Sequence, residues 1–181
     1  MNGAIFYSGK RGSTAQYAQW IGEATGLPVF DANDTQANPA DYDFLILGAS
    51  VIMMKMTIRK WVRAHWDSIK QKPTLLFSVS GVTADDPLLQ DWLRASYPAE
   101  LIERAPHFGL GGRLDLSKFN WLMRLFMRIG SYTKPTPEKK RDMQQGFDRV
   151  DKASIAPIVE WAVSHKEESA GRKGDATPLT V

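Results

Sequence analysis

The residues best suited to chemistry in this sequence form a short polar turn, Ser8 to Thr14, with the sequence Ser-Gly-Lys-Arg-Gly-Ser-Thr. An apolar segment precedes the turn and a helical pattern follows it, so main-chain N–H groups and the positive end of a helix dipole should face the turn. Gly12 lets a ligand approach the main chain closely. The hydroxyl donors and positive charges that suit a phosphate group come from Ser8, Lys10, Arg11, Ser13 and Thr14. A helix N-terminus that binds no ligand has the same residue types, so the turn alone leaves both interpretations open.

Two further loops follow buried strands and should lie beside this turn. The apolar run Phe44–Leu47 leads into one loop, and the run Thr74–Val79 leads into the other. Ligands of open parallel sheets bind outside the carboxyl ends of the strands, so we expect both loops to border a flat ring with polar edges. Methionine also fills gaps in cores, so core packing is the alternative interpretation of Met53. The candidate ring-binding residues are Ser50, Val51, Ile52, Met53, Ser80, Gly81, Val82 and Thr83.

The elements that must position these loops are short β-rich segments that alternate with longer helical patterns. Strands are predicted at Ala4–Tyr7, Leu27–Phe30, Phe44–Leu47, Thr74–Val79 and His107–Leu114. Helices are predicted at Thr14–Ala24, Ile58–Ile69 and Asp86–Tyr97, with a closing helix that begins near Glu138 and includes Pro157–Trp161. This alternation predicts an α/β fold, in which a doubly wound parallel sheet of five strands has helices on both faces.

The composition suits one globular domain, since the 181 residues are 43% hydrophobic and 24% charged. We expect this domain at 1–166, an inserted amphipathic helix at about 117–131, and an irregular tail at 167–181. The absence of cysteine excludes thiolate catalysis, iron–sulfur ligation and disulfides. The net charge of +3 favours anionic ligands or surfaces. We expect neither a metal site nor a nucleic-acid partner.

The opening segment resembles the flavodoxin family, in which a strand, a Ser/Thr-rich phosphate loop and a helix follow one another. The departure is Gly9, where that family usually has Ser or Thr. The resemblance implies a flavodoxin-like sheet in strand order 2-1-3-4-5 and FMN as the cofactor. The turn lacks both the P-loop lysine spacing and the GxGxxG fingerprint, so FMN suits it better than ATP or NAD. The matching residues are Ile5, Phe6, Tyr7, Gly12, Thr14, Ala18 and Ile21.

Over most of its length the chain is more similar to the bacterial quinone-dependent protoporphyrinogen oxidases, which resemble flavodoxins with an added helical segment. That family tends to have aromatic and histidine residues after the Gly-Ala-Ser loop, whereas this chain has methionines at 53, 54 and 56. The resemblance implies that hydrogens are removed from a porphyrinogen in heme biosynthesis and that menaquinone or ubiquinone accepts the electrons. It rests on Gly48–Ser50 with Lys55 and the next Trp-containing helix, on Phe77–Ser80, and on Gly109–Leu114 leading to Phe119–Ile129.

The segment Trp121–Ile129 has apolar residues around most of a helix, and Arg124 and Arg128 share one narrow stripe. A membrane interface, a quinone or a tetrapyrrole would cover this apolar surface, and a buried helix or a dimer contact is the alternative. The sequence opens without the features of a secretory signal. It also contains no apolar run long enough to span a membrane. We therefore expect a cytoplasmic protein and leave peripheral contact with the inner face of the cell membrane, and a homo-oligomer, open.

Three functional hypotheses follow from these patterns. The first is an FMN-dependent oxidoreductase of the quinone-linked protoporphyrinogen dehydrogenase type. The second is a flavodoxin-type electron carrier that has no substrate of its own, and the third is an interaction domain that has kept the fold without the flavin. The catalytic residues are unknown. His65 and His107 are available as general bases, but a histidine at helical spacing is more often a packed residue.

Overall fold

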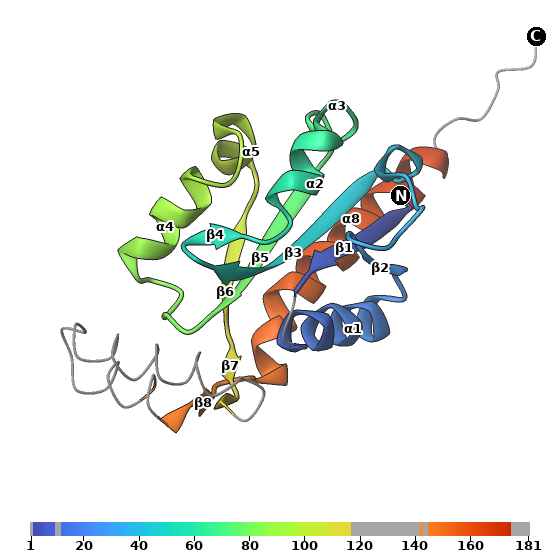
Figure 1. The fold of residues 1–181 in the computed structure, drawn as a ribbon. Helices are drawn as coiled ribbons and strands as arrows, with labels where there is room; N and C mark the ends of the chain where they lie inside the picture. Colours follow the sequence, from blue (N-terminus) through green and yellow to red (C-terminus); the bar gives the residue numbers. More distant parts are fainter. Residues whose placement is uncertain (1, 10–11, 117–141, 143–144, 175–181) are drawn as a thin grey trace, which may run out of the picture.

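The computed structural model describes residues 2–9, 12–116, 142 and 145–174. Its central sheet contains the parallel strands β1 (Gly3–Ser8), β2 (Val29–Asp31), β3 (Phe44–Ile52), β5 (Thr74–Ser80) and β6 (His107–Gly111). These strands lie in the order β2-β1-β3-β5-β6 (Figure 1). Counted among the parallel strands alone, this is the order 2-1-3-4-5, so the predicted doubly wound sheet is confirmed.

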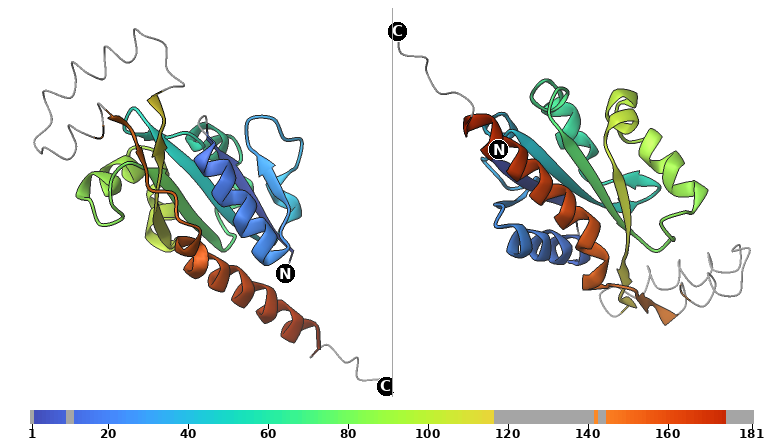
Figure 2. Two further views of the ribbon diagram at one scale, coloured as in Figure 1. Left: turned by 90° about the horizontal axis from the view of Figure 1, so that it is seen from below. Right: turned by 180° about the vertical axis from the view of Figure 1, so that it is seen from behind.

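Helices cover both faces of the sheet (Figures 1 and 2). One face is covered by α1 (Ser13–Thr25), the short 3-10 helix η3 (Lys152–Ile155) and α8 (Ala156–Gly174). The other face is covered by α2 (Arg59–Ala64), α3 (Trp66–Ile69), α4 (Pro87–Arg94) and α5 (Ala99–Arg104). A further 3-10 turn, η1 (Pro39–Asp41), lies in the connection between β2 and β3.

The alternation of side chains along β3 builds two cores. Phe44 and Ile46 pack in the layer that contains α1 and α8, whereas Leu45 and Leu47 pack in the layer that contains α2 to α5. All four side chains are fully buried. A strand that is covered on both sides needs apolar residues at every position, which explains the continuous apolar run.

The strand β3 extends further than the sequence pattern predicts. The apolar run predicts a strand end at Leu47, but β3 continues to Ile52, and β4 (Lys55–Met56) pairs antiparallel with its last residues. Gly48 lies within the strand and is paired with Phe77 of β5. The Phe77 ring occupies the space that a side chain at position 48 would need, since a Cβ there would lie 2.1 Å from that ring. Ser50, Val51 and Ile52 therefore belong to a strand, and the expected loop is only the tip of a β-hairpin.

The last expected strand, His107–Leu114, is also divided. β6 ends at Gly111, and β7 (Arg113–Leu114) leaves the sheet to pair antiparallel with β8 (Phe147–Asp148). The two short strands form a ribbon at the carboxyl end of the sheet (Figure 1). This pairing joins Arg113 to Asp148, 35 positions apart, and Leu114 to Phe147, 33 positions apart, and no local pattern predicts it.

The closing helix begins at Ala156, so its predicted start near Glu138 is wrong. Gly146, with a φ of 79°, β8 and η3 precede the helix, and the Asp151 side chain accepts a hydrogen bond from Ala153 N to start η3. The helix α8 continues to Gly174, into the segment 167–181 that was expected to be irregular. The expected inserted helix at 117–131, with Trp121–Ile129, lies outside the described residues.

Candidate functional site

The N-terminus of α1 carries the polar turn that the sequence singles out. Gly12 is the N-cap residue, and its φ of 90° lies in the left-handed region that favours glycine. Within the part of the chain that the structure describes, no side chain caps the first turn of the helix. The helix therefore presents main-chain N–H groups and the positive end of its dipole at the carboxyl end of β1, which is an arrangement that attracts anions.

The Ser13 side chain is the most informative group in this turn. Ser13 is only 6% exposed, and among the described residues its Oγ has no hydrogen-bond partner. A buried hydroxyl without a partner costs about 1–3 kcal/mol, so such a group calls for an explanation. A ligand that accepts a hydrogen bond from Ser13 would supply that explanation, and a phosphate oxygen is such an acceptor.

The turn is tied to β3 by a pair of hydroxyl groups. Thr14 Oγ1 lies 2.7 Å from Ser50 Oγ. A Cβ at Gly9 would lie 2.7 Å from Thr14 Cβ and 2.9 Å from Ser50 Oγ, so the pair occupies the space that a side chain at position 9 would need. Gly9 lacks the hydroxyl that the flavodoxin pattern has at this position. The hydroxyl groups of Thr14 and Ser50 occupy the space where that side chain would lie.

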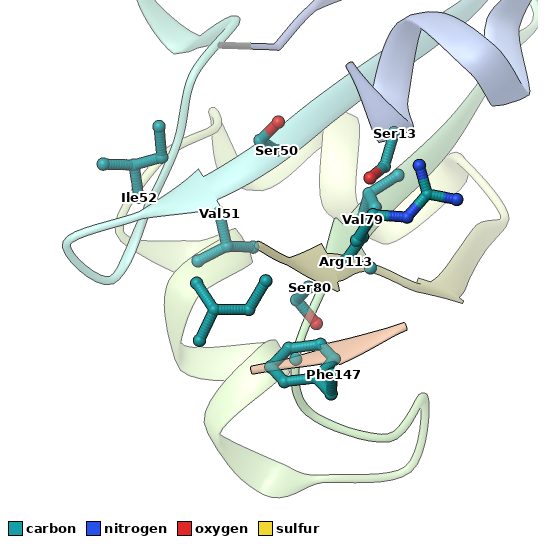
Figure 3. Close-up of a pocket in the computed structure, with 11 residues that line it drawn as sticks. Ser13, Ser50, Val51, Ile52, Val79, Ser80, Arg113 and Phe147 are labelled. Atoms are coloured by element: carbon teal, nitrogen blue, oxygen red, sulfur yellow. The ribbon is translucent and has the colours of Figure 1, made fainter. Parts of the chain in front are cut away.

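A cavity of about 80 Å³ opens where β3, β5 and β6 end (Figure 3). Six of the predicted site residues line it, and they come from three separate segments of the chain. The other lining residues, which the sequence does not predict, come from β5, from the β6–β7 connection, from β7 and from β8. The predicted residues are Ser13, Ser50, Val51, Ile52, Ser80 and Gly81, and the additional residues are Val79, Gly112, Arg113, Leu114 and Phe147.

Phe147 is the aromatic residue that the sequence pattern does not reveal. Its ring lies against Gly81, where a Cβ would come within 2.7 Å of Phe147 Cζ. The guanidinium of Arg149 stacks on the ring at 4.8 Å from the centroid and donates a hydrogen bond to Gly81 O at 2.8 Å. Arg113 Nε pairs with Asp148 at 2.7 Å and joins β7 to β8, while the hydrogen bond from Arg149 to Gly81 O connects the chain after β8 to the end of β5.

The ribbon also limits the size of the cavity. Pockets for drug-sized ligands have volumes of about 300–1,000 Å³, several times the 80 Å³ enclosed here. This volume is smaller than a flat ring of three fused cycles would fill. Few sequence signals mark Phe147, because it is a single aromatic residue in a short strand that is distant in the chain from the other loops.

The remaining predicted residues lie elsewhere. Ser8 and Met53 line a second cavity on the other side of the β3–β4 hairpin. Val82 N lies 3.3 Å from Ser80 Oγ, but Val82 and Thr83 do not line the first cavity. Lys10 and Arg11 lie outside the described residues.

Neither histidine that the sequence offers as a base lines the cavity at the strand ends. His65 Nδ1 lies 2.9 Å from Trp61 O, and its ring packs on the Trp61 ring. His107 Nε2 lies 2.9 Å from Ser78 Oγ, and burial lowers the pKa of His107 to about 4. Within the described residues, no cluster of three or more His, Asp or Glu side chains could hold a metal ion.

A doubly wound sheet with an uncapped helix N-terminus and a cavity at its carboxyl edge defines an α/β protein of the mononucleotide-binding class. The model of the flavodoxin domain family matches residues 4–149, and the chain belongs to this family. Family membership supports FMN as the cofactor, which the sequence resemblance implies. The buried Ser13 hydroxyl and the uncapped N-terminus of α1 suit the phosphate end of that molecule.

Several solved structures are similar to this chain. A flavodoxin from the domain Archaea is 16% identical, with a TM-score of 0.49 over 90% of this chain and 99% of that chain. Flavodoxin 1 from Bacillus cereus is 15% identical, with a TM-score of 0.47 and coverages of 90% and 97%. A flavoprotein in complex with FMN from Lactobacillus acidophilus is 12% identical, with a TM-score of 0.44 and coverages of 65% and 95%. The curated proteins include no match to the chain.

Proposed function

We propose that this protein is an FMN-dependent oxidoreductase of the flavodoxin domain family. The observation that carries the proposal is the buried Ser13 hydroxyl, which has no hydrogen-bond partner among the described residues, at the N-terminus of α1. The redox chemistry would be supplied by the bound FMN, because flavins carry hydride and electron transfer and the protein orients them. The chain has no cysteine that could replace it.

The residues of the chain divide the binding task between two ends of the cavity. Ser13 and the first N–H groups of α1 would hold the phosphate, while the Thr14–Ser50 pair keeps the turn against β3. Val51 and Phe147 offer apolar surface to a flat ring, and main-chain groups around Gly81 offer polar contacts to its edge. The β7–β8 ribbon would then cover the ring and exclude water from it.

The finer proposal concerns the reaction. The similarity to quinone-dependent protoporphyrinogen oxidases supports a porphyrinogen as the electron donor and a quinone as the acceptor. Each oxidation step would take two hydrogens from the porphyrinogen and reduce one quinone to one quinol, so that electrons and protons balance. Peripheral membrane contact through Trp121–Ile129 belongs to the same proposal, because a quinone is dissolved in the membrane. Within the described part of the chain, no helix is both long and apolar enough to cross a bilayer.

An assay of the FMN-loaded protein tests this reaction. The protein is mixed with protoporphyrinogen and menaquinone under anaerobic conditions, and the fluorescence of the protoporphyrin product is followed. The expected result is porphyrin formation that depends on both protein and quinone. Oxidation no faster than the spontaneous rate, in a sample that retains FMN, would refute the proposed reaction while leaving the cofactor proposal in place.

A second candidate function is that of an electron carrier without a substrate of its own. One observation favours it: among the described residues that line the cavity, Arg113 is the only ionisable one, so no side chain there is suited to proton transfer. Electron exchange with a flavodoxin reductase, without porphyrinogen oxidation, would support this function. A purified protein whose spectrum has no flavin bands and that binds no added FMN would instead favour a flavin-free interaction domain.

A further inference from the structure

A second cavity lies on the other side of the β3–β4 hairpin and has no role in the proposed function. Its volume is about 600 Å³, which is within the range of small-molecule sites. It is bounded by the ends of β1 and β2, by the hairpin and by the start of α2. The lining residues are Ser8, Asn33, Ile52, Met53, Lys55, Thr57, Arg59 and Lys60.

The charged side chains that line this basic pocket, among the residues that the structure describes, are all positive. Lys55, Arg59 and Lys60 line it, and no carboxylate among the described residues does. The ion pairs within the described part of the chain involve other residues, so these three cations have no acidic partner there. Arg59 Nη1 donates a hydrogen bond to Met56 O at 3.1 Å, which anchors its side chain. Three cations that converge on one cavity create a positive potential that attracts anions.

The inner wall of the basic pocket is a network of satisfied polar groups. Asn33 Nδ2 donates to Ser8 Oγ at 3.2 Å, and Thr57 Oγ1 donates to Ser8 O. Ser50 N donates in turn to Thr57 Oγ1 at 3.1 Å. Because these groups are already bonded to one another, the wall is preorganised, and the cationic side chains are the groups with free hydrogen-bonding capacity.

The hairpin tip supplies the apolar side of the basic pocket. Met53 and Met54 have φ values of 50° and 61°, a left-handed backbone conformation that residues other than glycine rarely adopt. Met53 is 87% exposed although it is apolar. Backbone strain and an exposed apolar side chain at one position are more typical of a binding site than of a purely structural turn.

The basic pocket is separate from the site proposed for FMN. Ser13 and Thr14, at the N-terminus of α1, do not line it. Ile52 is the only one of the described residues that lines both cavities, so the hairpin forms the wall between them. Figure 3 shows Ile52 and Ser13 at opposite sides of the first cavity.

We infer that the basic pocket is a second binding site, for a small organic anion that carries carboxylate or phosphate groups. The cations recognise the anionic groups, and Ile52 and Met53 contact the apolar part of the ligand. The hairpin wall would place this ligand next to the flavin cavity, where its binding can influence the exchange of electrons with the cofactor.

Calorimetric titration with two simple probes tests this inference. Pyrophosphate represents phosphate ligands and citrate represents carboxylate ligands, at an ionic strength held constant with potassium chloride. The titrations use the double variant K55Q/K60Q, which leaves the anchored Arg59 in place. The matched control is R63Q/R94Q, which removes the same charge from exposed residues of α2 and α4 that do not line the pocket.

The expected result is saturable binding of at least one probe to one site per chain. The variant K55Q/K60Q should weaken that binding by about tenfold or more, because two charge-assisted hydrogen bonds are lost, whereas R63Q/R94Q should change it by less than about twofold. The probe that binds more tightly identifies the class of the anionic group. Saturable binding of neither probe, equal losses in both double variants, or displacement of the probe by FMN would overturn the inference. The titrations are performed on both FMN-free and FMN-loaded protein, so a failure of FMN to bind leaves this test intact.

Discussion

Replacement of Ser13 by alanine should shift two properties of the protein in opposite directions. In the FMN-free protein the Ser13 hydroxyl is buried and has no partner among the described residues. Removing a buried polar group without a partner recovers part of a penalty of about 1–3 kcal/mol, so the free energy of unfolding should stay equal or rise by about 1 kcal/mol. In the complex with FMN the same hydroxyl would donate to a charged phosphate. The loss of such a bond, worth about 1.5–3 kcal/mol, corresponds to about 10- to 150-fold weaker binding.

Two titrations and one unfolding experiment measure these effects. FMN binding is followed by the quenching of flavin fluorescence, and the stability of FMN-free protein is followed by urea unfolding. Riboflavin, which lacks the phosphate, is the matched ligand control, and its affinity should not change in Ser13→Ala. Ser164→Ala is the matched protein control, because the Ser164 hydroxyl is exposed and donates to Trp161 O within α8. An unchanged FMN affinity in Ser13→Ala, or an equal loss for riboflavin, would refute the assignment of the phosphate to this turn.

Three further predictions concern stability. Gly9→Ala should lower the free energy of unfolding by about 1–3 kcal/mol, because its Cβ would overlap the Thr14–Ser50 pair, and a urea midpoint equal to that of the original protein would contradict this. Burial lowers the pKa of His107 to about 4, so below pH 6.5 the unfolded chain binds a proton more readily than the folded chain does. The free energy of unfolding should therefore fall by up to about 3 kcal/mol as the pH drops from about 6.5 to 4. Urea unfolding at several pH values measures this fall, and His107→Gln should flatten it. Lys72→Met should lower the free energy of unfolding by about 2 kcal/mol, because the ammonium donates to three main-chain carbonyls of the η1 segment; thermal unfolding measures this, and an unchanged midpoint would contradict it.

The sheet and its order could be predicted because each parallel strand carries its own signal. The runs around Phe6, Ile46 and Leu76 are apolar at consecutive positions, as strands covered on both faces require. Gly26, with a φ of 69°, ends α1 as a left-handed glycine should, and Asp86 caps α4 before a proline. These local rules agree with the tertiary packing, so the pattern and the structure coincide.

The elements that were missed depend on contacts between distant parts of the chain. The Gly-Ala-Ser segment at 48–50 has the composition of a loop, yet it is held in β3 by the ring of Phe77 and by pairing with β5. The hairpin after it has methionines at both left-handed positions, where Asn or Gly is the usual signal. The pairing of β7 with β8 joins Leu114 to Phe147 and has no periodicity to reveal it.

The candidate site also has one part that local sequence predicts and one part that depends on contacts between distant parts of the chain. The turn proposed for the phosphate could be located from the sequence, because strand, turn and helix are contiguous and Ser13 and Thr14 follow directly on Gly12. The other wall of the cavity depends on Phe147 and Arg113, which reach it only through the β7–β8 ribbon. The direction of the Ser8 side chain, toward Asn33 rather than toward α1, depends in turn on the loop that follows β2.

The most direct test of the central claim is the ratio of the affinities of this protein for FMN and riboflavin, measured by fluorescence titration of flavin-free protein. If the N-terminus of α1 and Ser13 hold a phosphate, two or more charge-assisted hydrogen bonds distinguish the two ligands, and FMN should bind at one site per chain about 100-fold more tightly or better. Equal affinities for the two flavins, or no saturable binding of FMN, would contradict the account.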